Sequence, residues 1–204
     1  MNGSDKSVTM PDRFRDPYIF ENILAMNGMV LESGGVIDLS RVAFIEPYSM
    51  VSFLLMGRNY LRKRGERIRL VNIPVQIHQY MTRMDFLNKD IFQVSESLNA
   101  GMMLKRSAAS GRLIEIIEIP NKERKSVNVI ASVIALFRRR ASVILKYWMN
   151  ESVVDYFVTV ISELCQNIFE HSMDTGYLAM QTYKAGTENI ARLVISDSGI
   201  GIKG

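Results

Sequence analysis

Three polar side chains recur at four-residue intervals near the C-terminal end of the chain. They are Glu163, Asn167 and His171. On an α-helix this spacing places all three on one stripe, each about one turn above the last. A carboxylate, an amide and an imidazole in such a row could bind metal, water or phosphate. We expect the apolar residues of the same stretch to fall largely on another side of the helix and to pack into a core: Val160, Ile161, Leu164, Ile168 and Phe169.

A second polar motif, Asp197-Ser-Gly-Ile-Gly201, begins about 26 residues later. It directly follows the apolar run Leu193-Val-Ile195, which predicts a strand. A carboxylate at a strand end can accept a hydrogen bond from an amino group. Gly199 and Gly201 would let the backbone approach a flat ring closely. Each motif alone is common, but a helix, a hairpin and a strand-end aspartate in this order are what a two-layer ATP site requires.

Together the two motifs resemble those of the gyrase, histidine-kinase and MutL ATPase superfamily, which has the Bergerat fold. The resemblance covers residues of about 113–204 and implies ATP and Mg²⁺ as cofactors. In that family the ATP lid and the second glycine motif follow the first glycine motif, where this chain ends. We therefore expect a partial ATP-binding domain, without useful turnover by this chain as written.

The resemblance also implies a role for each motif residue. Asn167 would coordinate Mg²⁺, and His171 would lie near the phosphates. Asp197 would bond the adenine amino group, with Gly199 and Gly201 completing the first glycine motif. Glu163 would be the general base for water or for an acceptor hydroxyl.

The surrounding pattern predicts the elements that position these residues. Leu113 to Ile119 is expected to be a strand closed by Pro120, and a long helix is expected from about Ser126 to Tyr147. Asn150 or Ser152 can cap a second helix that continues to about Ser172. Two strands joined by a turn through Gly186 should follow: Tyr177 to Lys184 and Ile190 to Ser196.

The N-terminal part alternates between strand and helix patterns after an expected loose arm, residues 1–16. Pro47 and Gly65 suit the start and the end of one of its helices. This alternation with short loops implies a parallel sheet with crossover helices. The expected helices are Tyr18 to Met26, ending near Gly28, then Tyr48 to Arg64 and Pro74 to about Met84; the expected strands are Val36 to Leu39, Arg67 to Asn72 and Ile91 to Val94.

This part resembles a STAS domain, the small domain of anti-sigma-factor antagonists. In that family a phosphorylatable Ser or Thr begins the helix that follows the segment corresponding here to Val42 to Glu46. Here Tyr48 stands at that position with Ser49 beside it, and we expect Ser49 to be an ordinary helix N-terminal residue. The segments that carry the resemblance are Val36 to Ser40, Val42 to Glu46, Ile68 to Ile73 and Met84 to Leu87.

The expected fold class is therefore α/β: a small STAS-like domain followed by the N-terminal portion of a two-layer α/β sandwich. We expect the STAS-like regulatory domain at residues 1–94, a linker at 95–112 and the partial ATPase domain at 113–204.

Composition restricts the other functional classes. The 204 residues carry a net charge of +4, too weak to imply nucleic acid alone. A single cysteine, Cys165, and a polar N-terminus without an apolar signal core indicate a cytoplasmic protein, and no apolar run is long enough to span a bilayer. We interpret three basic clusters as solvated helix faces and turns: Arg62 to Arg64, Lys122 to Lys125 and Arg138 to Arg140.

The leading functional hypothesis is an ATP-binding signalling protein, either an anti-sigma-factor-type serine/threonine kinase or a nucleotide-gated switch with a protein partner. The first alternative is a non-catalytic protein-binding module with a vestigial ATP site. The second is an ATPase that dimerises on binding ATP. None of these hypotheses requires nucleic acid or a membrane.

Overall fold

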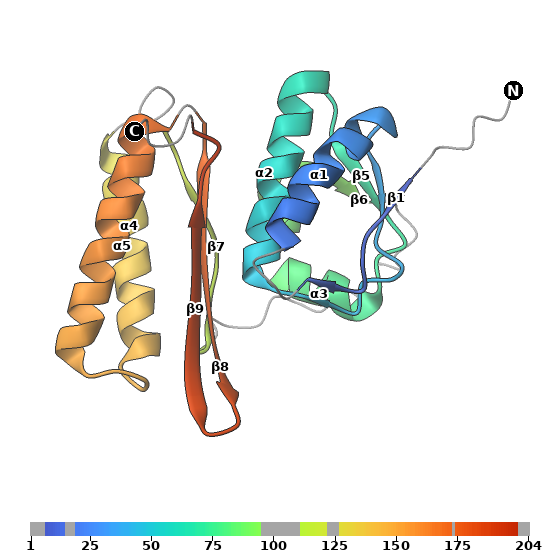
Figure 1. Cartoon of the computed structure of the whole chain (residues 1–204). Coiled ribbons are helices and arrows are strands. Elements are labelled where there is room, and N and C mark those ends of the chain that lie inside the picture. The colour runs from blue at the N-terminus through green and yellow to red at the C-terminus, as the bar shows by residue number, and fades with distance from the viewer. Residues whose placement is uncertain (1–6, 15–18, 95–110, 122–126, 173, 200–204) are drawn as a thin grey trace, which may run out of the picture. The chain divides into compact units, whose positions relative to one another are not determined.

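A computed structural model describes residues 7–14, 19–94, 111–121, 127–172 and 174–199. The chain divides into two compact units, Met1–Ser107 and Ala108–Gly204, which we describe separately. The first unit contains a parallel sheet and the second an antiparallel one, so the α/β class is confirmed (Figure 1). The predicted linker at 95–112 includes the division between the units, but its residues 95–110 lie outside the described part of the chain.

The first unit contains a four-stranded parallel sheet in the order β1-β3-β5-β6. A separate short parallel pair, β2-β4, aligns Arg13 with Phe44 and Phe14 with Ile45. Parallel neighbours require crossover connections, and helices supply them here, as the alternating sequence pattern predicts. The strands are β1 (Val8–Thr9), β2 (Arg13–Phe14), β3 (Val36–Asp38), β4 (Phe44–Ile45), β5 (Ile68–Val71) and β6 (Phe92–Val94).

Helix α2 begins and ends at the residues that the sequence indicates. Pro47 begins it, where a missing N–H is harmless. Gly65 ends it in the left-handed conformation, at φ 71°, and its N–H donates to the Leu61 carbonyl at 2.8 Å. Ser49 is fully buried in its first turns, which fits an ordinary structural residue. The helical elements of the unit are α1 (Ile19–Glu32), α2 (Pro47–Arg64), α3 (Val75–Arg83) and the 3₁₀ turn η1 (Leu87–Lys89).

Two expectations for this unit are wrong. The supposed loose arm contains β1, which pairs with β3 (Val8 opposite Ile37), and the Met10 N–H donates to the Asp38 carbonyl at 2.9 Å. Helix α1 does not end near Gly28 but continues to Glu32. A glycine inside a helix costs about 1 kcal/mol relative to alanine, whereas burying Val30 beyond it contributes about 1.5 kcal/mol or more.

The second unit is a three-stranded antiparallel sheet in the order β7-β8-β9, with two helices over one face (Figure 1). Its boundaries lie close to those expected from the sequence. Gly186, at φ 62°, makes the tight turn between Ala185 and Glu188, which pair across the hairpin. The elements are β7 (Leu113–Ile119), α4 (Val127–Leu145), α5 (Glu151–His171), β8 (Gly176–Ala185) and β9 (Glu188–Ser196).

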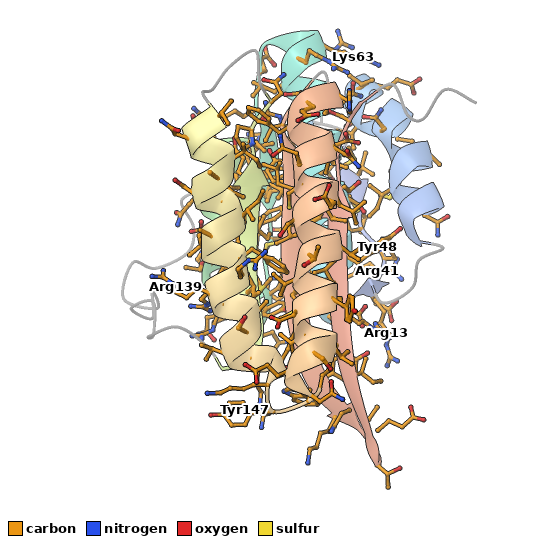
Figure 2. All side chains as sticks on the ribbon, turned by 90° about the vertical axis from the view of Figure 1, so that its left-hand side faces the viewer. Arg13, Arg41, Tyr48, Lys63, Arg139 and Tyr147 are labelled. Carbon is orange, nitrogen blue, oxygen red and sulfur yellow. The ribbon has the colours of Figure 1, made fainter. Side chains whose placement is uncertain are left out.

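Helices α4 and α5 lie side by side and share one core with the sheet. Figure 2 shows Arg139 on α4 pointing away from α5, and Tyr147 projecting beyond the end of α4. Arg140 ties α4 to β7, because its guanidinium donates to the Glu115 carboxylate at 3.1 Å and to the Leu113 carbonyl at 3.0 Å. No helix in the described ranges combines the length and apolar character needed to cross a membrane. Buried members of this core include Ile130, Phe137, Ile144, Val158, Ile161, Phe169, Leu178 and Met180.

Candidate functional site

Helix α5 carries the motif residues Glu163, Asn167 and His171, and its first turn is capped by a side chain. The Asn150 side chain accepts a hydrogen bond from the Val153 N–H at 3.0 Å, which caps the helix as the sequence predicts. At the other end, the Ser172 N–H donates to the Ile168 carbonyl at 2.9 Å. The helix is therefore closed at both ends, and its 21 residues hold the motif side chains on a rigid element.

The motif side chains Glu163, Asn167 and His171 are all exposed on α5. His171 lies 3.8 Å from the neighbouring Glu170 carboxylate, and Glu170 also accepts a 2.6 Å hydrogen bond from Gln166. The local interactions of the last helical turn thus involve His171 and leave the Glu163 and Asn167 side chains facing solvent.

The predicted separation of apolar and polar residues on α5 is only partly right. Ile161 and Phe169 are buried, and Ile168 packs against the core as expected. Val160 and Leu164 are exposed instead. Each lies within about 60° of Asn167 around a helix that turns 100° per residue, so they share the motif's flank and do not face the core. The side that does face the core consists of Val154, Val158, Ile161, Cys165 and Phe169.

Gly199 joins the second motif to the end of α5. Asp197 follows β9 directly, after Ser196. A Cβ atom placed on Gly199 would lie 3.0 Å from the Asp197 Oδ2 and 3.5 Å from both Cα and Oγ of Ser172. Ser172 is the residue after His171. The fold therefore brings the strand-end aspartate to the same end of the sheet as the last turn of the motif helix, and a side chain at position 199 would crowd the Asp197 carboxylate.

Gly176, at the start of β8, makes a second close junction in the same region. A Cβ atom there would lie 2.7 Å from Cγ2 of Ile168 and 3.1 Å from the Ser196 carbonyl oxygen. The absence of a side chain lets α5 approach the ends of β8 and β9 closely. The end of α5 therefore lies close to the start of β8 and to the residues that follow β9, because Gly176 and Gly199 have no side chains.

Sequence reasoning missed a buried polar loop between α5 and β8. Ser172, Asp174 and Thr175 are each less than 10% exposed. The Asp174 N–H donates to Ser172 Oγ at 3.3 Å, and the Thr175 N–H donates to Asp174 Oδ1 at 2.7 Å. The only signal in the sequence was a short polar run directly after the helical motif. Its role here is to turn the chain from α5 into β8 while satisfying backbone donors.

Ser198 is a further polar residue that the motif pattern did not single out. Its hydroxyl oxygen is buried and has no hydrogen-bond partner within the described part of the chain. A buried hydroxyl left without a partner is costly, so it marks a place where another polar group could be accommodated. Gly201, which the sequence analysis assigned to the same motif, lies outside the described residues.

The donors available for a metal ion are few. Within the described ranges, no three or more His, Cys, Asp and Glu side chains are grouped so as to hold one. Asn167 offers one amide oxygen, a hard ligand of the kind Mg²⁺ accepts. Mg²⁺ bound by few protein contacts and by the oxygens of a phosphate ligand is compatible with this set, whereas the described residues offer no group of side chains that would bind the ion by themselves.

Comparison of the chain with protein-family models, with curated proteins and with solved structures found no match. The functional argument therefore depends on the site itself. Its residues fit an adenine nucleotide in three respects: an accessible carboxylate at a strand end, a glycine whose missing side chain leaves space beside it, and a buried hydroxyl without a partner.

Proposed function

We propose that the C-terminal unit binds ATP with Mg²⁺ and that the chain belongs to a signalling protein of the anti-sigma-factor-kinase type. The observation that carries this proposal is the Gly199 junction. Gly199 lies close both to the Asp197 carboxylate and to Ser172, the residue that follows His171, so two motifs separated in sequence approach each other at one end of the sheet.

Each residue has a task that follows from its chemistry. The Asp197 carboxylate accepts a hydrogen bond from the adenine amino group, and Gly199 keeps the backbone beside it open. The Asn167 amide oxygen is the protein's ligand to Mg²⁺, and His171, near the phosphates, can donate a hydrogen bond to an anionic oxygen. ATP supplies a transferable phosphoryl group, and Mg²⁺ offsets the charge of its phosphates.

Glu163 is the residue that separates a kinase from a simple switch. An exposed carboxylate one turn before Asn167 can accept the proton of a water molecule or of a protein hydroxyl. If Glu163 does so, the protein transfers phosphate; if it does not, nucleotide binding alone changes the surface presented to a partner. The parallel sheet of the N-terminal unit supports its assignment as a STAS-like regulatory domain that would contact such a partner.

The direct test is calorimetric titration of Mg-ATP into the whole chain, up to millimolar nucleotide, with two variants. Asp197→Asn removes the negative acceptor at the site, and Glu188→Gln makes the same change at the exposed far end of β9. We expect the first to weaken binding about tenfold or more and the second to leave it unchanged. Absence of binding by the unaltered chain, or equal binding by both variants, would refute the proposal.

Phosphoryl transfer is tested separately with γ-labelled ATP in a version of the protein extended past Gly204, and with the Glu163→Gln variant of that version. Label that appears in protein or as free phosphate, and that disappears in Glu163→Gln while nucleotide affinity is kept, supports a kinase or ATPase. Nucleotide binding without release or transfer of label supports the non-catalytic switch. Nucleotide-dependent dimerisation in light scattering would support the third possibility.

A further inference from the structure

The hairpin end of the second unit contains a cavity of about 300 Å³. Its walls come from the segment before β7, from the turn between α4 and α5, and from the two strands of the hairpin. Asp197 follows the opposite end of the same sheet, because Tyr177 and Lys184 lie near the two ends of β8, roughly 23 Å apart at about 3.3 Å per residue. The residues that line the cavity are Gly111, Arg112, Tyr147, Trp148, Lys184 and Asn189.

The floor of the cavity is formed by a cross-strand pair on the sheet. Lys184 and Asn189 lie directly opposite each other in the β8–β9 ladder, and both are exposed. They continue the side of the two strands on which Met180 and Leu193 pack into the core. Figure 1 shows the β8–β9 hairpin extending past the ends of α4 and α5, so the sheet is accessible there on its helix-facing side.

Aromatic rings form one wall of the cavity. Tyr147 and Trp148 lie in the turn after α4, where the Trp148 N–H donates to the Leu145 carbonyl at 2.8 Å. Tyr147 is 75% exposed and projects beyond the end of α4 (Figure 2). The ammonium of Lys146 lies 5.0 Å from the centroid of the Tyr147 ring, which adds a positive charge beside this wall. The two rings offer π-faces on which a planar group can stack.

The polar side chains of the cavity are mainly hydrogen-bond donors. Arg112, Lys184 and the indole N–H of Trp148 can only donate, whereas the Asn189 amide can also accept. Within the described part of the chain, no hydrogen bond or ion pair involves the side chains of Lys184, Trp148 or Asn189. Arg112 is anchored through its carbonyl, which accepts hydrogen bonds from the Thr182 N–H at 2.7 Å and from its hydroxyl at 3.1 Å.

No carboxylate among the described residues lines the cavity. Glu188 is adjacent to Asn189 in sequence, but successive side chains of a strand point to opposite sides of the sheet, so its carboxylate lies on the other side. Glu151, at the start of α5, is three residues after Trp148 and does not line the cavity either. The lining therefore has two cationic side chains and no anionic one, which favours a ligand with a negative charge.

We propose that this cavity binds a free mononucleotide, with its base stacked on Tyr147 and Trp148 and its phosphate held by Arg112 and Lys184. Cationic donors suit phosphate oxygens, and every base has a π-face on which aromatic rings can stack. A volume of about 300 Å³ is at the lower end for small-molecule sites. Two lining cations suffice for one phosphate, whereas a nucleic-acid strand requires a basic groove that continues along its backbone.

The inference goes beyond the proposed function and does not depend on it, because the cavity and the Asp197 motif lie at opposite ends of the sheet. None of the residues that line the cavity belongs to the ATP motifs.

The test uses the fluorescence of Trp148, the single tryptophan of the chain, which a stacked base should change directly. The whole chain is titrated with uridine monophosphate and with guanosine monophosphate up to millimolar concentration. Uridine alone and inorganic phosphate alone are the control ligands. Lys184→Gln is compared with Arg139→Gln, which removes one exposed cation from α4. Tyr147→Ala is compared with Tyr156→Ala, which removes a ring that is 77% exposed on α5, and circular dichroism checks that all four variants fold.

We expect both monophosphates to change the fluorescence saturably and to bind about tenfold or more tightly than uridine or phosphate. Lys184→Gln and Tyr147→Ala should each weaken binding about fivefold or more, and the two control variants should stay within about twofold. The proposal is overturned by the lack of a saturable change with either monophosphate, by equal affinity for phosphate alone, or by equal effects of a variant and its control. A uridine oligonucleotide of about ten residues that binds more than about tenfold tighter than uridine monophosphate would also overturn it, because the occupant would then be nucleic acid.

The same titration with Asp197→Asn separates this inference from the proposed function. Uridine monophosphate lacks the adenine amino group that Asp197 is proposed to bind, so this variant should keep its affinity within about twofold. Loss of uridine monophosphate binding in Asp197→Asn would place the ligand at the ATP motif and overturn the inference. If the chain binds uridine monophosphate but not Mg-ATP, the proposed function is wrong and this inference stands.

Discussion

Replacing Gly176 by alanine should destabilise the C-terminal unit through one specific contact. The added Cβ would lie 2.7 Å from Cγ2 of Ile168 and 3.1 Å from the Ser196 carbonyl, so either α5 or the start of β8 has to shift. Inserting a methyl group into a packed junction costs about 1–3 kcal/mol. We expect about 2 kcal/mol, because the backbone carbonyl on one side cannot rotate away as a side chain can.

The assay is urea unfolding followed by tryptophan fluorescence. The chain has one tryptophan, Trp148, which lies between α4 and α5 and therefore reports on the C-terminal unit alone. With a slope of about 1–1.5 kcal/mol per molar urea, the expected loss lowers the midpoint by about 1.3–2 M. Gly111→Ala is the matched control, because a Cβ there meets nothing within 4 Å, and its effect should stay within about 0.5 kcal/mol.

A double-mutant cycle identifies the contact. Ile168→Ala removes the atom that the new Cβ would meet, so Gly176→Ala should cost less in that background by about 0.5–3 kcal/mol. Additive effects of Gly176→Ala and Ile168→Ala, or an effect of Gly176→Ala no larger than that of Gly111→Ala, would refute the account of this junction.

Three further predictions concern the same unit. Asn150→Ala should cost about 1 kcal/mol in urea unfolding, because the Val153 N–H loses its cap; an unchanged midpoint would contradict this. Burial raises the pKa of the Cys165 thiol from 9.0 to about 12, so the folded state disfavours the thiolate. The unfolding free energy of the wild type relative to Cys165→Ala should therefore fall between pH 9 and 12, by up to about 1.4 kcal/mol per pH unit, and a constant difference would be the contrary result. Gly199→Ala should crowd the Asp197 carboxylate and weaken Mg-ATP binding about tenfold by calorimetry, whereas unchanged affinity would show that this space is not used.

Boundary residues made much of the fold predictable. Pro47 and Gly65 define α2, Asn150 defines the start of α5, and Gly186 defines the turn between β8 and β9. In each case one residue type suits a backbone conformation that most others adopt at a cost. Such signals are local and can be recognised without knowing what packs where.

The errors concern features that depend on the tertiary structure. Strand β1 has two residues and little pattern of its own, and it is a strand because β3 lies beside it. Helix α1 continues through Gly28 because the packing of Val30 outweighs a weak local preference.

The candidate site shows the same division. The spacing of Glu163, Asn167 and His171 places them together on any helix, so their common flank was predictable. The exposure of Val160 and Leu164 was not, because an apolar residue near a polar stripe can face either the core or solvent. The closeness of Gly199, two residues after Asp197, to Ser172 at the end of α5 depends on the path of two strands, which no local pattern determines.

The measurement that tests the central claim most directly compares ATP with inosine triphosphate. Inosine has a carbonyl where adenine has the amino group that Asp197 is proposed to bind. The account predicts that the chain prefers ATP by about tenfold or more, that Asp197→Asn removes this preference, and that Glu188→Gln keeps it. Equal affinity of the unaltered chain for both nucleotides, or a preference for ATP that persists in Asp197→Asn, would contradict the assignment of Asp197 as the adenine-binding residue.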